Sequence, residues 1–445
     1  MSFPEIFEPL KFRTFETKNR IFRSNVSGRF DNYDGSGSQT RLNWEEQFAK
    51  GGVGAIISSF VPVSIRGRIV PGYATIHSDE RIPFWTAVGK AVHSHGCKFI
   101  MQLSHSGRQQ DIAGVENQYR GAISSTDKTE SFHGLVSHRM TEEQIWEVIG
   151  QFADGAVRAQ KAGLDGVELH AANGYLFTQF LSSAINDRKD KWGGPLENRA
   201  RFLLEVVRAI RAKVPDYHLQ VKISAIEYNN ALFPWEKKGN TLEDSIQVCK
   251  WLMDEKIDGL HVSTGSMFPH PRNPMGDFPV DEAQKWYDGM LSSGVHTHRN
   301  YMFFRSRILR PIFQYLWRRT GEAPEKVEGA NAATAHAIRE AIGAKVPVIC
   351  TGGFQTGEHI CQVLRNHDCD AVSIARPLIA NRDMVNGFFA EGKEIPQVKR
   401  CTYCNKCLLN VLENPLSCYE LSRFEGDYQA MLDQAMSVYH PQPFR

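Results

Sequence analysis

The sequence has no excess of charge of either sign and no long apolar run. Its 52 lysine and arginine residues nearly balance 50 aspartate and glutamate residues, so the formal net charge is only +2. Such a balance does not favour a nucleic-acid partner. No stretch approaches the roughly 18 consecutive apolar residues that a membrane-spanning helix needs. The opening residues, MSFPEIFEPL, carry acids and prolines where a signal peptide has an apolar centre. We therefore expect a cytoplasmic globular protein.

Cysteine usage argues against a disulfide framework. The chain has nine cysteines in 445 residues, an odd number, and four of them crowd together near the C-terminus. Secreted disulfide scaffolds are short and dense in cysteine. A reduced chain with a metal site fits this pattern better.

Eight short β-rich runs recur along the chain, most of them followed by a helical pattern. The runs are nearly all apolar rather than alternating, which is typical of parallel strands covered on both faces. Eight such strands with intervening helices predict an α/β fold, specifically a (β/α)8 or TIM barrel. The runs are RIFRSNVS (20–27), VGAIISSF (53–60), KFIMQLS (98–104), GVELHAA (166–172), LQVKIS (219–224), GLHVSTG (259–265), VPVICTG (346–352) and AVSIARP (371–377).

A doubly wound open sheet is the structural alternative. It needs a GxGxxG turn after its first strand, and NVSGRFDNYDGSG lacks that pattern, so the barrel is favoured. We expect the barrel to occupy residues 1–395, with a polar excursion at 105–140 and a long insertion at 266–330 after the sixth strand. Residues 396–445 form an extension that holds the cysteine cluster.

Polar side chains and glycines stand where the predicted strands end, and active sites of such barrels form at that end. Gln102 offers a donor and an acceptor, which suits the edge of a heterocycle, and Lys222 adds a positive charge. The glycines of TGGF and Arg376 follow the seventh and eighth strands, where these barrels often hold a phosphate. Together they predict a phosphorylated ring system across the barrel mouth. The full set is Ser27, Ser59, Gln102, His170, Asn173, Lys222, Thr264, Gly352, Gly353, Ala375 and Arg376.

Several longer motifs resemble the Old Yellow Enzyme family of FMN-dependent NAD(P)H oxidoreductases. The pieces are KNRIF near the start, QLSHSGR (102–108), GVELHAANGYLFTQFLS with NDRKDKWGGPLENRARF (166–202), TGGF, and SIARPLIAN (373–381). The resemblance covers about residues 3–395 except much of 266–330, and the block around His170 is its most specific part. It implies FMN as cofactor, NAD(P)H as co-substrate and an activated alkene as substrate.

The resemblance also implies roles for individual residues. Ser27, Gln102 and Lys222 would contact the flavin ring, and the FMN phosphate would lie against the Gly352–Gly353 loop with Ala375 and Arg376. His170 and Asn173 would bind the substrate's carbonyl or nitro oxygen, and Tyr175 would donate a proton. The chain departs from the family at Lys222, where many members carry arginine, so the bidentate fork is lost.

This arrangement suits the reduction of an electron-poor C=C bond. Hydride adds to the β-carbon while negative charge develops on the carbonyl oxygen, and two preorganised donors stabilise that charge. A tyrosine then protonates the α-carbon. An enzyme that acts on thioesters, like a 2,4-dienoyl-CoA reductase, is one alternative. A flavin-binding or metal-binding protein without turnover is the other.

The cysteine cluster reads CTYCNKCLLNVLENPLSC and comprises Cys401, Cys404, Cys407 and Cys418. Two Cys-x2-Cys steps and a fourth cysteine match the way thiolates collect around an iron–sulfur cluster or zinc. The position resembles the cluster motif of 2,4-dienoyl-CoA reductases, although the second interval is one residue shorter. A [4Fe–4S] cluster, a zinc ion and buried free thiols therefore stay open.

Residues 301–319, YMFFRSRILRPIFQYLWRR, are aromatic, apolar and basic. As an amphipathic surface helix this stretch could touch a membrane. Because Pro311 interrupts the stretch, we favour a lid or a contact between copies of the chain in a homo-oligomer.

Overall fold

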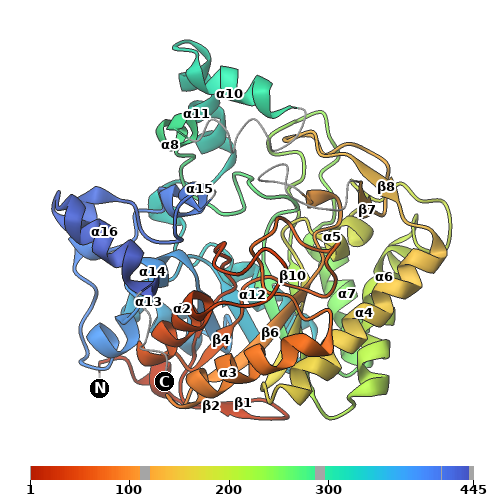
Figure 1. Ribbon diagram of the computed structural model, residues 1–445, viewed down its shortest axis with the longest axis horizontal. Helices are drawn as coiled ribbons and strands as arrows, with labels where there is room; N and C mark the ends of the chain where they lie inside the picture. Colours follow the sequence, from red (N-terminus) through yellow and green to blue (C-terminus); the bar gives the residue numbers. More distant parts are fainter. Residues whose placement is uncertain (1, 111–120, 286–295, 412, 440–445) are drawn as a thin grey trace.

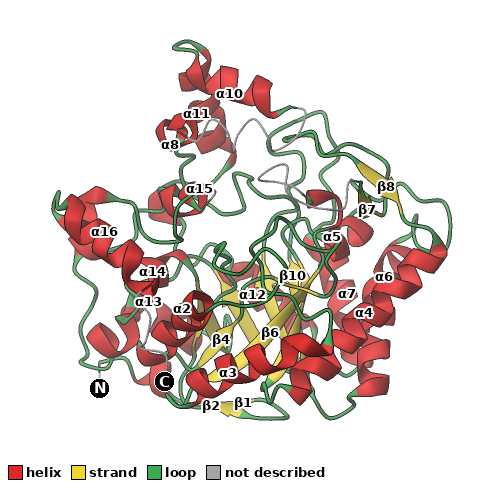
Figure 2. Ribbon diagram, viewed as in Figure 1, coloured by secondary structure: helices red, strands yellow, loops and turns green. Residues whose placement is uncertain are grey.

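Eight parallel strands close into a barrel, which confirms the predicted fold class (Figure 2). The computed structural model describes residues 2–110, 121–285, 296–411 and 413–439. The strands pair in the order β4, β3, β13, β12, β11, β10, β9 and β6, and a further β4–β6 pairing closes the ring. They are β3 (Ile21–Arg23), β4 (Ala55–Ile57), β6 (Lys98–Ser104), β9 (Gly166–Ala171), β10 (His218–Ser224), β11 (Gly259–Ser263), β12 (Val348–Thr351) and β13 (Ala371–Ile374).

Helices connect successive strands and cover the outside of the barrel (Figure 1). In α4, Thr141 and Gln144 form a reciprocal capping box, and a buried stripe that includes Ile145, Val148 and Phe152 packs on the sheet. The alternation of strand and helix thus follows the apolar periodicity seen in the sequence. The connecting helices are α2 (Gln39–Lys50), α3 (Ile82–His93), α4 (Glu142–Lys161), α6 (Leu196–Lys213), α7 (Leu242–Asp254), α12 (Ala332–Ala341) and α13 (Gly357–Arg365).

A short hairpin closes the amino-terminal end of the barrel. Strands β1 (Leu10–Lys11) and β2 (Glu16–Thr17) pair antiparallel, and they lie at the bottom of Figure 1. Phe12 beside them is buried against Phe22 and Ile349 from the barrel strands. This apolar plug leaves the opposite end of the barrel as the open one.

A polar network fills the barrel interior around Glu168. Its carboxylate accepts hydrogen bonds from Gln102 Nε2 at 2.7 Å, Gln220 Nε2 at 2.5 Å and the His261 ring at 2.9 Å. Burial opposes ionisation of Glu168, but His261 and the Lys222 charge outweigh that effect and lower its pKa to about 2. A buried carboxylate is tolerated only when it is paired in this way, so these side chains hold fixed positions across the barrel.

Three segments beyond the basic barrel surround its open end. Strand β5 (Val61–Pro62), which precedes β6 in the chain, pairs with the end of β6. The excursion after β6 contains the small parallel pair β7 (Ala122–Ser124) and β8 (Ser137–Arg139). The insertion after β11 contains α8 (Val280–Lys285), α10 (Thr297–Arg305) and α11 (Leu309–Thr320), which stand above the barrel in Figure 1. Residues 111–120 and 286–295 of the excursion and the insertion lie outside the described residues.

The extension after the barrel carries α15 (Lys406–Asn410) and α16 (Tyr428–Met436). The division of the chain at residue 395 stays a prediction. None of the described helices has both the length and the apolar content to cross a bilayer.

Candidate active site

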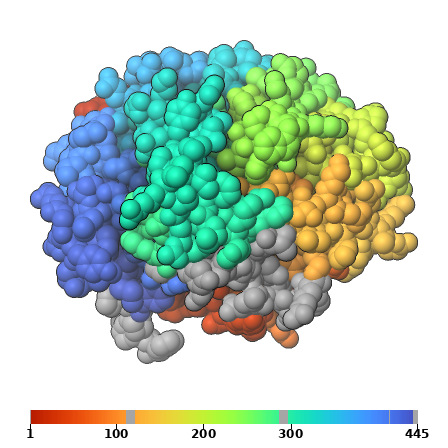
Figure 3. Space-filling view, turned by 90° about the horizontal axis from the view of Figure 1, so that it is seen from above, coloured from red at the N-terminus to blue at the C-terminus, as the bar shows by residue number. Residues whose placement is uncertain are grey.

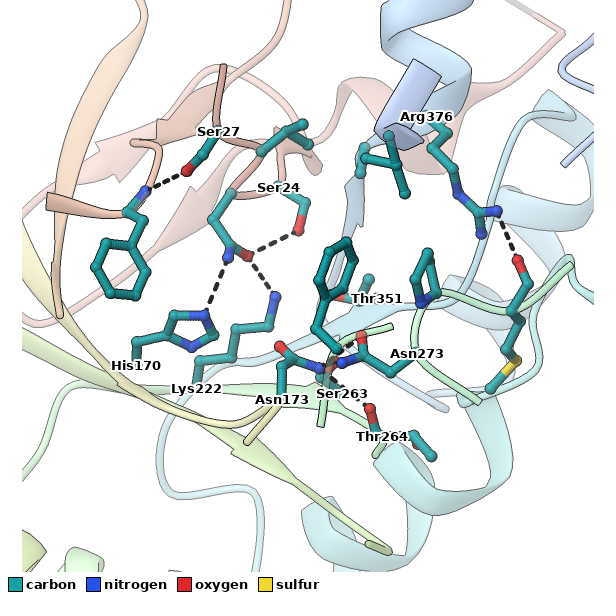
Figure 4. A pocket seen from close by; sticks show the side chains of 18 of the residues that line it. Ser24, Ser27, His170, Asn173, Lys222, Ser263, Thr264, Asn273, Thr351 and Arg376 are labelled. Carbon is teal, nitrogen blue, oxygen red and sulfur yellow. Dashed lines mark hydrogen bonds between the residues drawn. The ribbon is translucent and has the colours of Figure 1, made fainter. Parts of the chain in front are cut away.

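A cavity of about 1480 Å³, measured with its open mouth, lies at the carboxyl ends of the barrel strands (Figure 4). Of the residues predicted at the strand ends and of Tyr175, all line it except Gln102 and Ser59. Ser59 is buried behind the cavity wall, where its hydroxyl accepts from Arg41. Gln102 is fully buried in the barrel interior instead, where its Nε2 donates to Glu168. The predicted lining residues are Ser27, His170, Asn173, Tyr175, Lys222, Gly352, Gly353, Ala375 and Arg376.

Lys222 and His170 meet through Asn25, a residue that the sequence did not single out. Lys222 Nζ donates to Asn25 Oδ1, and the amide nitrogen of Asn25 lies 3.5 Å from His170 Nε2. Burial lowers the pKa of Lys222 to about 8, although the Glu168 charge opposes this. Burial and the Lys222 ammonium also hold the pKa of His170 well below its usual value. Near neutral pH this corner therefore carries one positive charge, on Lys222, beside a neutral imidazole.

A left-handed turn positions Asn173 just after β9. Asn173 has φ 62°, a conformation that asparagine tolerates better than most residues. Its Nδ2 lies 3.2 Å from Ser263 Oγ, 3.1 Å from the Thr264 carbonyl and 3.0 Å from Asn273 Oδ1. The two hydrogens of the Asn173 amide thus have three acceptors within reach, and these contacts hold the side chain in place.

The turn also requires Gly174. A Cβ added to Gly174 would lie 2.3 Å from the Ser266 carbonyl oxygen, so only glycine fits beside that backbone. The chain then enters α5 (Leu176–Leu181) directly after Tyr175. The close succession of His170, Asn173 and Tyr175 is thus a strand end, a tight turn and a helix start.

Tyr175 lies in an aromatic cluster beside His170. The ring centroids of Tyr175 and His170 are 4.9 Å apart, and Phe60 lies 4.9 Å from Tyr175 on another side. Burial, with a contribution from Tyr73, raises the pKa of Tyr175 above its usual value. The phenol therefore stays protonated through the physiological range and can act as a proton donor.

Arg376 marks the other end of the cavity, across from Lys222 in Figure 4. It begins α14 (Arg376–Ala380) and is held by two residues of the cysteine loop. Its Nη1 donates to Asn405 Oδ1 at 2.5 Å, and its guanidinium carbon lies 5.3 Å from the centre of the Tyr403 ring. The Tyr403 hydroxyl donates to the Gly353 carbonyl at 2.5 Å. Tyr403 and Asn405 thus clamp both parts of the predicted phosphate site.

The two residues of this clamp stand in the cysteine motif, but no role was predicted for them from the sequence. Tyr403 and Asn405 alternate with the cysteines in CTYCNKC, and attention to the cysteine spacing passed over the residues between them. Both residues have positive φ, 55° and 60°. With this backbone, Tyr403 contacts Gly353 and Asn405 contacts Arg376.

These features fit a phosphorylated ring. A buried cation stands at one end of the cavity, and an arginine with a glycine turn stands at the other. Gln102 Oε1 and His170 Nδ1 are buried and have no hydrogen-bond partner among the described residues. Because buried polar atoms normally have hydrogen-bond partners, a molecule bound in the cavity would be expected to supply them for Gln102 Oε1 and His170 Nδ1.

The four clustered cysteines line one small cavity of about 290 Å³ with Arg376. Cys407 and Cys418 are buried, and Cys401 and Cys404 are half-buried. Within the described parts of the chain, no group of three or more histidine, cysteine or acidic residues is placed around a single ion. A metal or cluster at these four cysteines therefore stays a prediction.

A second, apolar cavity of about 740 Å³ adjoins the first one. The two share Phe268, Pro274 and Leu408, so we name the second cavity the annex. Its walls come from the excursion, the insertion and the extension. They are Phe132, His133, Phe268, Pro269, Pro274, Phe278, Pro279, Thr297, Asn300, Trp317, Asn405, Leu408 and Leu409.

Comparisons with known proteins agree with the predicted resemblance. The family model described as NADH:flavin oxidoreductase / NADH oxidase family matches residues 5–285. An NADH oxidase of Thermoanaerobacter brockii is 37% identical over 265 residues, which are 59% of this chain but 39% of that protein. An NADPH dehydrogenase of Halalkalibacterium halodurans is 37% identical over 268 residues, 60% of this chain and 75% of that protein. The predicted class, an NAD(P)H-dependent flavin oxidoreductase, is confirmed at the level of the family.

Solved structures show the same fold at lower identity. A 2-naphthoyl-CoA reductase in complex with 2-naphthoyl-CoA has a TM-score of 0.73 and 23% identity, and the match covers 96% of this chain and 58% of that chain. An Old Yellow Enzyme homologue of Zymomonas mobilis has a TM-score of 0.65 and 22% identity, over 91% of this chain and 99% of that chain.

Asn405→Ala tests the clamp on Arg376. Loss of a hydrogen bond to a charged group costs roughly 1.5–3 kcal/mol, so we expect about a tenfold or greater loss of FMN affinity, measured by fluorescence titration. Asn410→Ala is the matched control. Its amide lies on the same extension but bonds the Lys406 carbonyl and Glu282. Equal FMN affinities for the two variants would contradict the clamp.

Proposed function

Because the chain belongs to the NADH:flavin oxidoreductase / NADH oxidase family, we propose that it binds FMN at the barrel mouth and reduces electron-poor C=C bonds with NAD(P)H. One observation carries this proposal. A single cavity joins the cationic corner at Lys222, the anion-binding end at Arg376, and the lip formed by His170, Asn173 and Tyr175. Bound FMN would supply the hydride, taken first from NAD(P)H.

The two charged ends define how the cofactor would be held. Arg376 and the turn at Gly352 and Gly353 would bind its phosphate, and Lys222 with Ser27 would face its ring. Gln102 would reach the ring from below, with Oε1 as the free acceptor. The Ser27 hydroxyl already accepts from the Phe60 backbone N–H at 2.9 Å, so this side chain is oriented before any ligand binds.

His170 and Asn173 would polarise the substrate. A neutral imidazole N–H and an amide N–H both donate hydrogen bonds without bringing a charge that competes with the flavin. As negative charge grows on the substrate's carbonyl oxygen, these donors stabilise it, each by roughly 3 kcal/mol. Asn173 would exchange one of its three present acceptors for that oxygen.

Tyr175 would complete the reaction by protonating the α-carbon. Its raised pKa keeps the phenol protonated until a carbanion-like carbon forms next to it. The packing of Tyr175 against Phe60 and His170 restricts its ring to one orientation, so the proton is offered from a fixed position.

The annex indicates an alkene with an apolar, ring-sized portion. Its aromatic and proline walls offer a substrate few hydrogen-bonding partners. A non-polar group that entered there would gain about 25 cal/mol for each Å² of surface removed from water. The polar end of the same substrate would remain at His170 and Asn173.

An aromatic thioester is the second candidate substrate. One structural neighbour, over 96% of this chain, is a reductase in complex with 2-naphthoyl-CoA, and the aromatic and proline walls of the annex would suit a flat ring. The same assay separates the two candidates, because enones and aryl thioesters can be offered in parallel to the reduced protein.

We also propose that Cys401, Cys404, Cys407 and Cys418 hold a [4Fe–4S] cluster, with zinc as the alternative. The shared cavity supports the cluster. Bound there, the cluster would carry electrons or brace the loop that holds Tyr403 and Asn405 against the phosphate site.

Tyr175→Phe tests the proton-donor role. We expect NADPH to reduce the bound flavin at an unchanged rate, and the enone-dependent reoxidation to slow by about 10²–10⁴, both followed by anaerobic stopped-flow absorbance. Tyr73→Phe is the comparison, since Tyr73 lines the same cavity. If Tyr73→Phe slows reoxidation and Tyr175→Phe does not, the assignment of the proton donor is wrong.

Metal analysis tests the cysteine site. Anaerobically purified protein should contain iron and acid-labile sulfide in equal amounts, and Cys407→Ser should lose both. Cys369→Ser, a buried cysteine of the barrel, should keep them. Zinc without sulfide would favour the alternative, and four titratable thiols without metal would contradict both.

A further inference from the structure

The insertion presents an apolar and basic surface on its outer side. Seven of the sixteen exposed large hydrophobic side chains among the described residues fall between Met302 and Leu316. Ile308 is 76% exposed and Tyr315 is 62% exposed. We name this surface the arm face. Its apolar members are Met302, Phe303, Ile308, Leu309, Ile312, Tyr315 and Leu316.

The arm face is distinct from the side on which the insertion packs. Phe304 and Trp317 are buried, and their rings lie 5.2 Å and 4.9 Å from the ring of Phe278. That inner side also forms part of the annex wall through Trp317. Helices α10 and α11 are therefore anchored through this inner side, and the residues of the arm face stay exposed on the other.

The stretch 301–319 is interrupted, as expected from the sequence, but the break lies between α10 and α11 at residues 306–308 and not at Pro311. Pro311 is the third residue of α11, which begins at Leu309. Backbone N–H groups in the first turn of a helix have no acceptor within the helix, so proline is tolerated there. Ile308, Ile312, Tyr315 and Leu316 then follow at helical spacing and form one stripe.

The charged residues of helices α10 and α11 are all basic. Residues 297–320 contain six arginines and no aspartate or glutamate. Arg310 pairs with Asp281, and Arg318 Nε lies 2.7 Å from Asp277 Oδ1. The four others form no ion pair with an acidic side chain in the described parts of the chain. They are Arg299, Arg305, Arg307 and Arg319.

We propose that the arm face lies on an anionic phospholipid membrane, with the apolar residues of α10 and α11 at the level of the acyl chains and the free arginines among the headgroup phosphates. Helices that lie in a membrane interface combine these two features, an apolar stripe and a basic flank. Each arginine near such a surface strengthens binding about fivefold. A second copy of the chain is disfavoured as the occupant, because a two-fold contact would bring the same unpaired arginines together.

This position has a consequence for the barrel. In the view from above (Figure 3), the teal atoms of this part of the chain lie across the middle of the face. The arm face is the outer side of the same helices whose inner side walls the annex. The proposed membrane contact would therefore hold the annex close to a source of lipophilic molecules. Membrane binding itself does not depend on the proposed enzymatic function.

Vesicle co-sedimentation of the full FMN-loaded chain tests the proposal. We expect binding to vesicles of phosphatidylglycerol mixed with phosphatidylcholine, and weak binding to phosphatidylcholine alone. Ile312→Ser with Leu316→Ser should lower the bound-to-free ratio roughly tenfold or more. Arg307→Glu with Arg319→Glu should lower it by at least about tenfold, since two charges are reversed.

Two matched variants control for general surface changes. Tyr428→Ser with Met436→Ser removes exposed apolar side chains from α16, and Lys11→Glu with Lys90→Glu reverses two exposed charges elsewhere on the barrel. Both should bind vesicles as the wild type does. All variants should retain their flavin absorbance, which reports the fold.

Three outcomes would overturn the proposal. The first is wild-type protein that stays in the supernatant with anionic vesicles. The second is arm variants that bind as well as the wild type. The third is a lipid-free dimer, seen by analytical ultracentrifugation, that the Ile312→Ser with Leu316→Ser variant dissociates, because the arm face would then be a contact between copies of the chain.

Discussion

The pairing of β4 with β6 closes the parallel sheet, and this closure gathers residues far apart in the sequence at one mouth. Asn25 follows the first barrel strand and Lys222 lies in the fifth, yet their side chains form a hydrogen bond. An open sheet would leave these two strands apart. The hairpin plug at the other end adds to this effect, because it leaves only the mouth accessible.

Buried polar contacts then give the mouth its chemistry. The network around Glu168 compensates a charge in the barrel interior and lies directly below the cavity. Above it, Lys222 supplies the positive charge that the proposed flavin ring would meet. On the far side, Asn405 and Tyr403 of the cysteine loop contact Arg376, and Tyr403 also bonds Gly353, at the proposed phosphate site. The extension is therefore part of the site and not an appendage to it.

Much of this could be predicted from the sequence, for identifiable reasons. All eight strands stand within predicted runs or one residue from them, because fully buried parallel strands leave continuous apolar stretches. Polar residues that interrupt such stretches mark the strand ends, which is how His170, Asn173 and Lys222 were found. Asn25 was not predicted because the strand was expected to extend to residue 27, whereas β3 ends at Arg23 and leaves Asn25 at the mouth.

Other features depended on packing that no local pattern records. The sequence did not indicate that the amide nitrogen of Gln102 donates to the Glu168 carboxylate in the barrel interior. The annex exists only because the excursion, the insertion and the extension meet above the barrel. The sequence could not distinguish the buried side of α10 and α11 from the arm face, because aromatic and apolar residues occur on both. Phe303 and Phe304 are adjacent in the chain, and only the structure shows that Phe304 is buried and Phe303 exposed.

The central claim is that one cavity binds FMN and passes hydride from NAD(P)H to an alkene. Anaerobic titration of the FMN-loaded protein with NADPH and then NADH, followed through the flavin absorbance, tests it most directly. The account predicts that at least one of the two nucleotides bleaches the flavin and that adding an enone restores the absorbance with consumption of the enone. Protein that takes up no FMN, or whose bound flavin neither nucleotide can bleach, would contradict the account.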